Sequence, residues 1–189
     1  MKTTKFIIVC IQRSGSTWLT TLLNSHPDIC CAEETFLLSK KNMCPMAMRK
    51  KIWPHKLGYP RYINSSIKRC LKHHFLRTKL INEYLNQFYS MPDYSAIGFK
   101  IMLNQIEKFS TMSDYFFKND VKVIHLVRDN ILKTFISRIS VSQKKVAHTQ
   151  KKLKFTKIYI PTEKIETKLQ KIKNDNKALE KLFFNRNII

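Results

Sequence analysis

The chain has 189 residues, 43% of them hydrophobic, and a formal net charge of +22 from 35 lysines and arginines against 13 acidic residues. This length and apolar content can supply the core of one domain, residues 1–189, and they exclude an intrinsically disordered protein. The positive excess favours anionic partners such as nucleotides, sulfated or phosphorylated sugars, nucleic acid or acidic membrane. A lysine-rich composition without any function would give the same total, and this alternative stays open.

Five cysteines occur without a C-x-x-C pair and without interleaved histidines. Their spacing is not that of a zinc site, and their odd number favours free thiols in a reducing compartment. The first apolar run is too short for a signal-peptide core, and no segment approaches the roughly 18 apolar residues of a membrane span. The sequence therefore predicts neither a structural metal nor a membrane-spanning segment.

Apolar runs and helical periodicity alternate along the chain. The run at about residues 5–11 is almost continuously hydrophobic, which is typical of a buried central strand. Residues 36–62 contain three prolines and no clean period, so we expect a long loop there with at most one helical turn. Further strands are predicted at about 29–32, 95–102 and 121–127, and helices at about 17–24, 63–89, after 102 to about 118, 130–145, and from 161 onward. The last helix is predicted to be amphipathic, with one apolar face formed by Ile165, Leu169, Ile172, Leu179 and Leu182.

This alternation predicts an α/β fold. Strands that alternate with helices imply right-handed crossovers and a central parallel sheet flanked by helices on both faces. In such folds ligands bind beyond the carboxyl ends of the strands. Two polar turns, one after residue 11 and one after residue 127, stand at predicted carboxyl ends and are therefore the candidate sites.

The first turn, Gln-Arg-Ser-Gly-Ser-Thr, leads directly into a helix. Ser14, Gly15, Ser16 and Thr17 can offer successive backbone N–H groups and three hydroxyls to one oxyanion, and the helix adds its positive N-terminal end. Arg13 adds a permanent charge with forked donors. The turn is thus predicted to bind an anion, and an ordinary strand-to-helix turn with serine caps is the alternative.

This turn differs from the ATP-binding pattern G-x-x-x-x-G-K-[ST]. When the two are aligned on Gly15, Cys10 stands at the first glycine and Ser16 at the lysine. No aspartate that would hold magnesium follows an apolar strand convincingly. A magnesium-dependent kinase or ATPase is therefore disfavoured, and the shorter turn suits a single 5′-phosphate with one group attached.

The second turn places Arg128 at the end of a predicted strand, with Ser137 nine residues later on the next helix. The guanidinium can bind a phosphate through two hydrogen bonds, and the serine can add one hydroxyl. This pair is a candidate phosphate site. The alternative is that Arg128 and Asp129 are surface charges and that Ser137 faces solvent.

The segments QRSGSTWL and LVRDN…S resemble the two signatures of the PAPS-dependent sulfotransferase family, where PAPS is 3′-phosphoadenosine 5′-phosphosulfate. NSHPDICCAEETF is similar to the family's helix end, His-Pro turn and acidic residue before an aromatic. AIGFKIMLNQI and VRDNILKTFISRISVSQKK…H resemble the branch that sulfates carbohydrates, so the resemblance covers roughly residues 5–38 and 95–150. It implies a P-loop-like three-layer fold. It also implies transfer of a sulfuryl group from PAPS, without a metal, to a hydroxyl of a carbohydrate or glycolipid.

The resemblance also implies roles for individual residues. Arg128 and Ser137 would hold the 3′-phosphate of PAPS. Glu34 would be the catalytic base, with Glu33 as its rival, and Arg13 would also steady charge on the leaving phosphate. The loop that binds the 5′-phosphosulfate would comprise Arg13, Ser14, Gly15, Ser16, Thr17 and Trp18.

The chain departs from the family pattern in several places. Asn130 replaces the proline that often follows Arg-Asp, and no glycine-rich adenosine-phosphate segment follows, so we expect the chain to end early. One alternative is a catalytically degenerate protein that binds PAPS or a sulfated glycan. A nucleotide or metabolite kinase is a second and less favoured alternative. A nucleic-acid-binding protein is disfavoured, because the aromatic residues do not alternate with Lys and Arg in a recognised motif.

Three further side chains bear on the site. Lys100 stands near the end of the 95–102 strand, where it could reach a sulfuryl group, but we expect a solvated lysine. His125 lies in a buried strand and is expected to be a hydrogen-bonded core histidine. Trp18 either stacks on a base or packs under the loop. Two compartments fit the sequence: the cytoplasm for a complete chain, and the Golgi lumen for a chain that has lost an N-terminal anchor.

Overall fold

The computed structural model describes residues 3–37, 58–91, 94–144, 157–160, 162–163 and 165–183. Within these ranges one sheet has the strand order β2-β3-β1-β4, and every neighbouring pair is parallel. The predicted α/β fold with a central parallel sheet is confirmed, and the strand bounds agree with prediction to within a residue or two. The strands are β1 (Thr4–Cys10), β2 (Ile29–Ala32), β3 (Ala96–Met102) and β4 (Lys122–Leu126).

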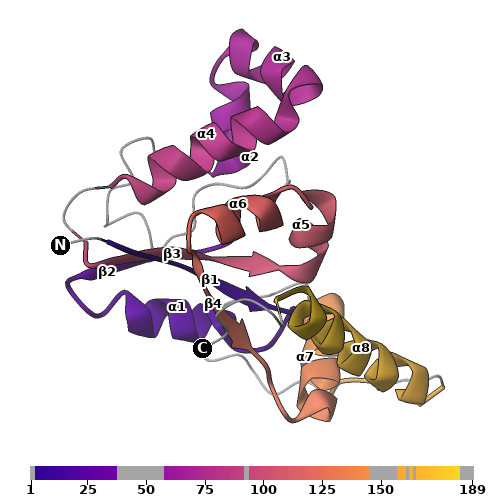
Figure 1. Cartoon of the computed structure of the whole chain (residues 1–189). Coiled ribbons are helices and arrows are strands. Elements are labelled where there is room, and N and C mark those ends of the chain that lie inside the picture. The colour runs from indigo at the N-terminus through magenta and orange to yellow at the C-terminus, as the bar shows by residue number, and fades with distance from the viewer. Residues whose placement is uncertain are drawn as a thin grey trace.

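Helices cover both faces of the sheet (Figure 1). In this view α1 lies below the sheet, and the layer that contains α4, α5 and α6 lies above it. The helices of the described ranges are α1 (Ser16–Leu23), α2 (Tyr59–Asn64), α3 (Ile67–Phe75), α4 (Arg77–Tyr89), α5 (Leu103–Lys108), α6 (Met112–Lys118), α7 (Ile131–Lys144) and α8 (Ile165–Phe183). No helix of these ranges is both long enough and apolar enough to cross a membrane.

The apolar run of β1 supplies side chains to both faces of the sheet. Ile7 and Val9 join the larger core, whose helical members come from α2, α4 to α6, α7 and α8. Phe6 and Ile8 join a smaller core on the opposite face, against which Leu19 of α1 packs. A strand covered on both faces must be apolar at every position, which explains why the run does not alternate with polar residues.

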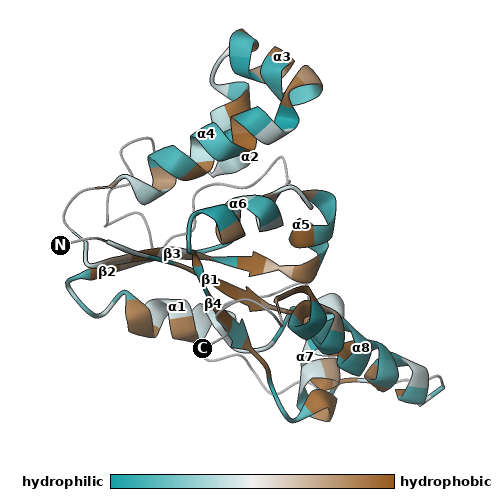
Figure 2. Cartoon of the chain, in the orientation of Figure 1, coloured by the Kyte–Doolittle hydropathy of each residue, from teal (hydrophilic) through white to brown (hydrophobic). Residues whose placement is uncertain are grey.

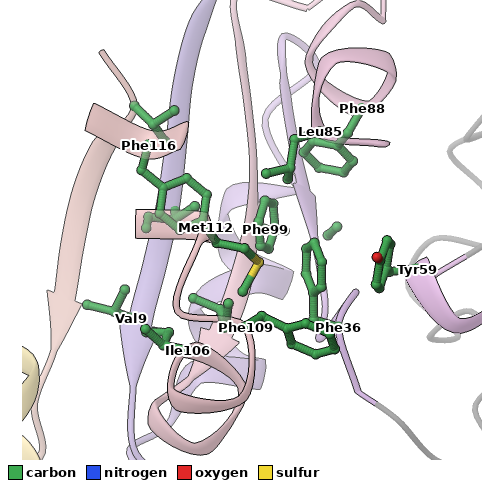
Figure 3. Packing of buried hydrophobic residues seen from close by; sticks show 14 of the residues in the cluster. Val9, Phe36, Tyr59, Leu85, Phe88, Phe99, Ile106, Phe109, Met112 and Phe116 are labelled. Atoms are coloured by element: carbon green, nitrogen blue, oxygen red, sulfur yellow. The ribbon is translucent and has the colours of Figure 1, made fainter. Parts of the chain in front are cut away.

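Aromatic rings fill much of the larger core (Figure 3). The ring of Phe36, which follows β2, lies with its centroid 5.7 Å from that of Phe99 on β3 and 5.4 Å from that of Phe109 after α5. The Tyr59 ring of α2 lies tilted against the same Phe36 ring, with the two centroids 4.8 Å apart. The core therefore holds the segment just after β2 firmly against β3, and this segment carries the two candidate carboxylates.

The helical region between β2 and β3 differs from the prediction of one helix over residues 63–89. It forms three helices, because the chain leaves helical geometry at Ser66 (φ −157°) and at Leu76 (φ −133°). Serine is common at helix starts, and Ser66 stands at the start of α3, although its side chain forms no capping hydrogen bond there. Most of the predicted loop, residues 38–57, lies outside the described residues.

The last helix, α8, also differs in one detail. Ile172 and Leu179 are buried as predicted, but the third buried apolar side chain is Phe183, whereas Leu182 is exposed. Ile165 and Leu169 are partly buried against the same core. The 3.6-residue period places positions 172, 179 and 183 on one face, so the predicted stripe was shifted at its C-terminal end.

Candidate functional site

The carboxyl ends of the strands meet at one edge of the sheet. Cys10, the last residue of β1, pairs with Met102 of β3 and with Leu126 of β4, so the segments that follow these strands emerge side by side. From β1 the chain runs to α1 on one face, and from β3 it runs to α5 on the other (Figure 1). Parallel α/β sheets bind ligands at such a switch point.

The loop after β1 has an unusual backbone. Gly15 (φ 96°) and Arg13 (φ 71°) are both left-handed, a conformation that glycine adopts freely and arginine only at an energetic cost. A Cβ atom added at Gly15 would meet nothing within 4 Å, so there is open space beside the start of α1. The Ser14 hydroxyl donates to the Ile11 carbonyl at 2.8 Å and is thus used inside the loop. The loop leaves room for a ligand at the helix N-terminus.

The two predicted phosphate sites lie against each other. The Arg13 Nε donates to the Ser137 Oγ at 2.9 Å, and the Arg128 Nη1 donates to the Arg13 carbonyl at 3.4 Å. A third guanidinium, that of Arg138, donates from Nε to the Gln12 carbonyl at 3.4 Å. Burial lowers the pKa of Arg138, an effect that Asp175 opposes. Three guanidinium groups around one loop form a cationic site suited to an anionic ligand.

The expectation that Lys100 is solvated is wrong. Only 2% of its side chain is exposed, and its ammonium group forms an ion pair with Glu33. The same nitrogen lies 3.3 Å from Thr17 Oγ1 and 3.7 Å from the Glu34 carboxylate. Because β3 is covered on both faces, the ammonium group of a lysine within this strand loses its hydration and requires a carboxylate partner.

The two neighbouring carboxylates have different surroundings. Glu33 accepts a hydrogen bond from the buried Thr20 hydroxyl at 2.8 Å and pairs with Lys100, so it is committed to the structure. Glu34 accepts from Gln105 Nε2 at 2.8 Å, and Gln105 Oε1 in turn accepts from the Met102 N–H at 3.2 Å. The Glu34 side chain is 23% exposed against 11% for Glu33. Glu34 is therefore the oriented carboxylate that a ligand can reach.

Trp18 does not pack under the loop, since 71% of the residue is exposed on α1. The alternative, stacking on a base, stays a prediction. Cys10 is a buried thiol, and burial raises its pKa to about 11, an effect that a hydrogen bond with Ser16 partly opposes. A thiol with this pKa stays protonated at neutral pH, so Cys10 is not a nucleophile for this site.

His125 of β4 does not have the hydrogen bonds expected of it. Its Nε2 is buried and has no hydrogen-bond partner among the described residues. Burial lowers the pKa of His125, and Glu180 on α8 opposes that shift. Burial therefore favours the neutral form of the imidazole, and His125 takes part in none of the contacts described above that join the charged groups.

Sequence reasoning missed the roles of Lys100, Gln105, Thr20 and Arg138. One signal was available for Lys100: it is a single cation inside an otherwise apolar strand, AIGFKIM, while two glutamates follow the neighbouring strand. The pairing of Ala32 with Phe99 places Glu33 beside Lys100.

Within the described ranges, His, Cys, Asp and Glu side chains form no group of three or more that could hold a metal ion.

Comparison with known proteins gives one clear result. Residues 5–183 match the description of the sulfotransferase family, a wider span than the two segments in which the sequence resemblance was recognised. No curated protein matches the chain at a significant level. The matched span includes the loop after β1, the buried lysine of β3, the arginine and serine after β4, and α8. The chain therefore belongs to the sulfotransferase family, whose members generally use PAPS as donor.

Proposed function

We propose that this protein transfers a sulfuryl group from PAPS to a hydroxyl of a carbohydrate or glycolipid acceptor. One observation carries the proposal: Arg13 and Ser137, which are 124 positions apart in sequence, meet through a 2.9 Å hydrogen bond at the carboxyl edge of the sheet. The contact joins a loop suited to a 5′-phosphosulfate to a helix suited to a 3′-phosphate. A donor with negative charge at both ends matches a site of this kind.

The donor set at this edge fits PAPS. Arg13, the loop N–H groups and the hydroxyls of Ser16 and Thr17 would hold the 5′-phosphosulfate. Arg128 and Ser137 would hold the 3′-phosphate, and the Ser137 hydroxyl can still donate while it accepts from Arg13. These groups are cationic or neutral donors, as a polyanion requires. The exposed ring of Trp18 can stack on the base.

The chain contributes position and charge to the reaction. PAPS, when bound, supplies a sulfuryl group that is already attached to a good leaving group. Glu34, held by Gln105, would take the proton of the acceptor hydroxyl. The Lys100 ammonium lies between Thr17 and Glu34 and, with Arg13, would offset the negative charge that builds on the leaving phosphate.

Calorimetric titration with adenosine 3′,5′-bisphosphate and with ATP tests the donor. We expect the 3′-phosphorylated nucleotide to bind better, and to do so without magnesium. Arg128→Ala should weaken this binding by roughly tenfold to a hundredfold, the value of charge-assisted hydrogen bonds. Lys133→Ala is the matched control, because it removes one positive charge from an exposed position on the neighbouring α7. Tight, magnesium-dependent ATP binding would contradict the proposal.

Transfer of labelled sulfate from PAPS onto a panel of sugars, glycolipids and phenols tests the reaction. Glu34→Gln should reduce turnover by about 10²–10⁴-fold, the usual contribution of a positioned base, while nucleotide affinity stays the same. Glu107→Gln, at an exposed position on α5, is the control and should leave turnover unchanged. If Glu34→Gln turned over normally, Glu34 would not be the base. Bisphosphate binding without transfer to any acceptor would indicate a protein that only binds the donor.

A further inference from the structure

Helix α3 exposes its apolar side. Ile67, Leu71 and Phe75 recur every fourth residue, so they lie in one row along the helix, and they are 83%, 57% and 75% exposed. Leu76, which follows the helix, is exposed as well. No residue of α3 is buried. The row Ile67–Leu71–Phe75 is called the apolar row below.

The polar side of α3 is the side that contacts the domain. The Arg69 guanidinium lies 4.1 Å from the ring centroid of Tyr62 on α2. Lys72 forms a 2.5 Å ion pair with Glu83 on α4. His73 Nδ1 lies 3.1 Å from the Tyr59 hydroxyl, also on α2. Since these contacts fix the orientation of the helix, the apolar row is turned outward.

This arrangement is the reverse of an ordinary surface helix, which buries its apolar stripe and exposes its charges. Single exposed apolar residues are common, but a contiguous exposed row marks a surface that binds something. In Figure 1, α3 lies at the outer end of the α2–α4 layer, far from the sheet. Figure 2 shows apolar and hydrophilic residues side by side along it. The row is thus presented at an extremity of the domain.

Positive charge surrounds the apolar row. Lys68 is exposed on α3 itself, and Lys79 is exposed in the first turn of α4. Beyond Phe75 a shallow, open groove of about 550 Å³ includes Arg77 in its wall. The groove is lined by Phe75, Leu76, Arg77, Thr78, Lys79, Asn82, Glu83 and Asn86. Apolar side chains bordered by cations match a surface that is apolar inside and anionic outside.

We propose that α3 docks this protein on the surface of an anionic lipid bilayer. The apolar row would enter the boundary between headgroups and acyl chains, and Lys68, Arg77 and Lys79 would meet lipid phosphates. A second copy of this chain is a poorer occupant, because each copy carries a net charge of +22 and the two would repel. The inference rests on α3 and its surroundings and is independent of the proposed transfer reaction.

Flotation with lipid vesicles tests this directly. We expect the protein to float with vesicles that contain phosphatidylserine and much less with phosphatidylcholine alone. The triple variant Ile67→Ser/Leu71→Ser/Phe75→Ser should bind phosphatidylserine vesicles about tenfold or more weakly. Burial of one large apolar side chain alone changes a binding constant by about tenfold. The control Leu22→Ser/Leu132→Ser/Leu182→Ser removes three other exposed leucines, on α1, α7 and α8, and should bind as the unaltered protein does.

A pair of charge variants separates a local effect from that of total charge. Lys68→Glu/Lys79→Glu and Lys171→Glu/Lys177→Glu change the net charge equally, and all four lysines are exposed. Lys68→Glu/Lys79→Glu, beside the apolar row, should reduce binding to phosphatidylserine vesicles by about tenfold or more. Lys171→Glu/Lys177→Glu, on α8, should reduce this binding clearly less. Equal losses from both pairs would overturn the proposal.

A label on Cys70 keeps the test valid even if the triple variant does not fold. Cys70 is exposed on α3, whereas Cys10, Cys30 and Cys31 are buried, so in a Cys44→Ser background an environment-sensitive dye should react at Cys70. Phosphatidylserine vesicles should shift its emission to the blue. Absence of that shift, or absence of flotation, would overturn the proposal. So would a self-association, measured by sedimentation velocity, that the triple variant abolishes.

Discussion

Lys100 joins three parts of the site that are distant in sequence. Its ammonium contacts Glu33 after β2, lies near Glu34, and reaches Thr17 at the start of α1. A charge that is only 2% exposed is tolerated because these oxygens replace water around it. The position of this single nitrogen therefore depends on the register of two strand pairs, and it fixes the distance between the loop and the carboxylates.

Removal of this cation should destabilise the fold. Lys100→Met leaves Glu33 buried without its partner, which costs about 3–5 kcal/mol in the free energy of unfolding measured by urea denaturation. Adding Glu33→Gln should recover a large part of the loss, because the uncompensated charge disappears. Lys122→Met is the control, since its ion pair with Asp120 is at the surface and should contribute at most about 1 kcal/mol. A double variant as unstable as the single one would contradict this account.

His125 should make stability depend on pH on the acidic side of neutrality. Burial lowers its pKa in the folded state, so between that value and the ordinary value near 6.5 the unfolded chain binds more protons than the folded one. The stabilisation is complete above about pH 6.5 and is lost as the pH falls toward the lowered pKa, by at most about 1.4 kcal/mol per pH unit.

Urea unfolding at a series of pH values checks this effect. His125→Gln should flatten the dependence below about pH 6.5 relative to the unaltered protein. His73, whose pKa is also lowered by burial, shifts stability in the same direction, so His73→Gln serves as the comparison. A curve that His125→Gln leaves unchanged would show that the imidazole is not held neutral.

At the scale of elements, local sequence was sufficient for most strands and helices. Four apolar runs became four strands, because a parallel sheet covered on both faces needs continuous apolar sequence. The sequence analysis did not predict the helix breaks at Ser66 and Leu76, because the spacing of apolar residues over positions 63–89 suggested one helix. That pattern misled because the apolar residues of α3 face outward, so their spacing does not report packing against the core.

The site was predictable only where its residues are neighbours in sequence. The Ser-Gly-Ser-Thr turn and the Arg128–Ser137 pair carry local signals: a turn before a helix, and an arginine at a strand end. Gln105 on α5 contacts Glu34 after β2, and Arg138 on α7 contacts the Gln12 carbonyl after β1, so both contacts form only when these elements are assembled. Such contacts depend on register and crossover geometry, which spacing along one segment does not specify.

Gly98 of β3 is required by close packing of strands. A Cβ atom at this position would lie 2.4 Å from the Phe6 ring and 2.5 Å from the Phe6 carbonyl oxygen on the neighbouring β1. Gly98→Ala should therefore reduce the free energy of unfolding by about 1–3 kcal/mol, the usual cost of overpacking. The paired variant Gly98→Ala/Phe6→Leu should regain only part, because the carbonyl contact remains. Thermal unfolding of both variants against Phe6→Leu alone measures this, and an unaltered Tm for Gly98→Ala would contradict it.

At the scale of the whole molecule, the sheet brings a few cationic groups to one edge, and lysines and arginines elsewhere in the chain contribute the rest of the net charge of +22. These two sources of charge act differently on an anionic ligand. Charge spread over the surface attracts the ligand from a distance and is weakened by salt. Guanidinium groups in contact with the ligand determine how long it stays bound.

Salt should therefore act mainly on the association rate of adenosine 3′,5′-bisphosphate. Stopped-flow binding at ionic strengths from about 0.01 M to about 0.3 M should show association slowing by roughly tenfold or more, with little change in dissociation. Lys171→Glu/Lys177→Glu, at two exposed positions of α8, should slow association at low salt and leave dissociation unchanged. Arg128→Ala should instead speed dissociation, because it removes a group proposed to contact the phosphate. A salt effect confined to dissociation would mean that the surface lysines have no part in attracting the nucleotide.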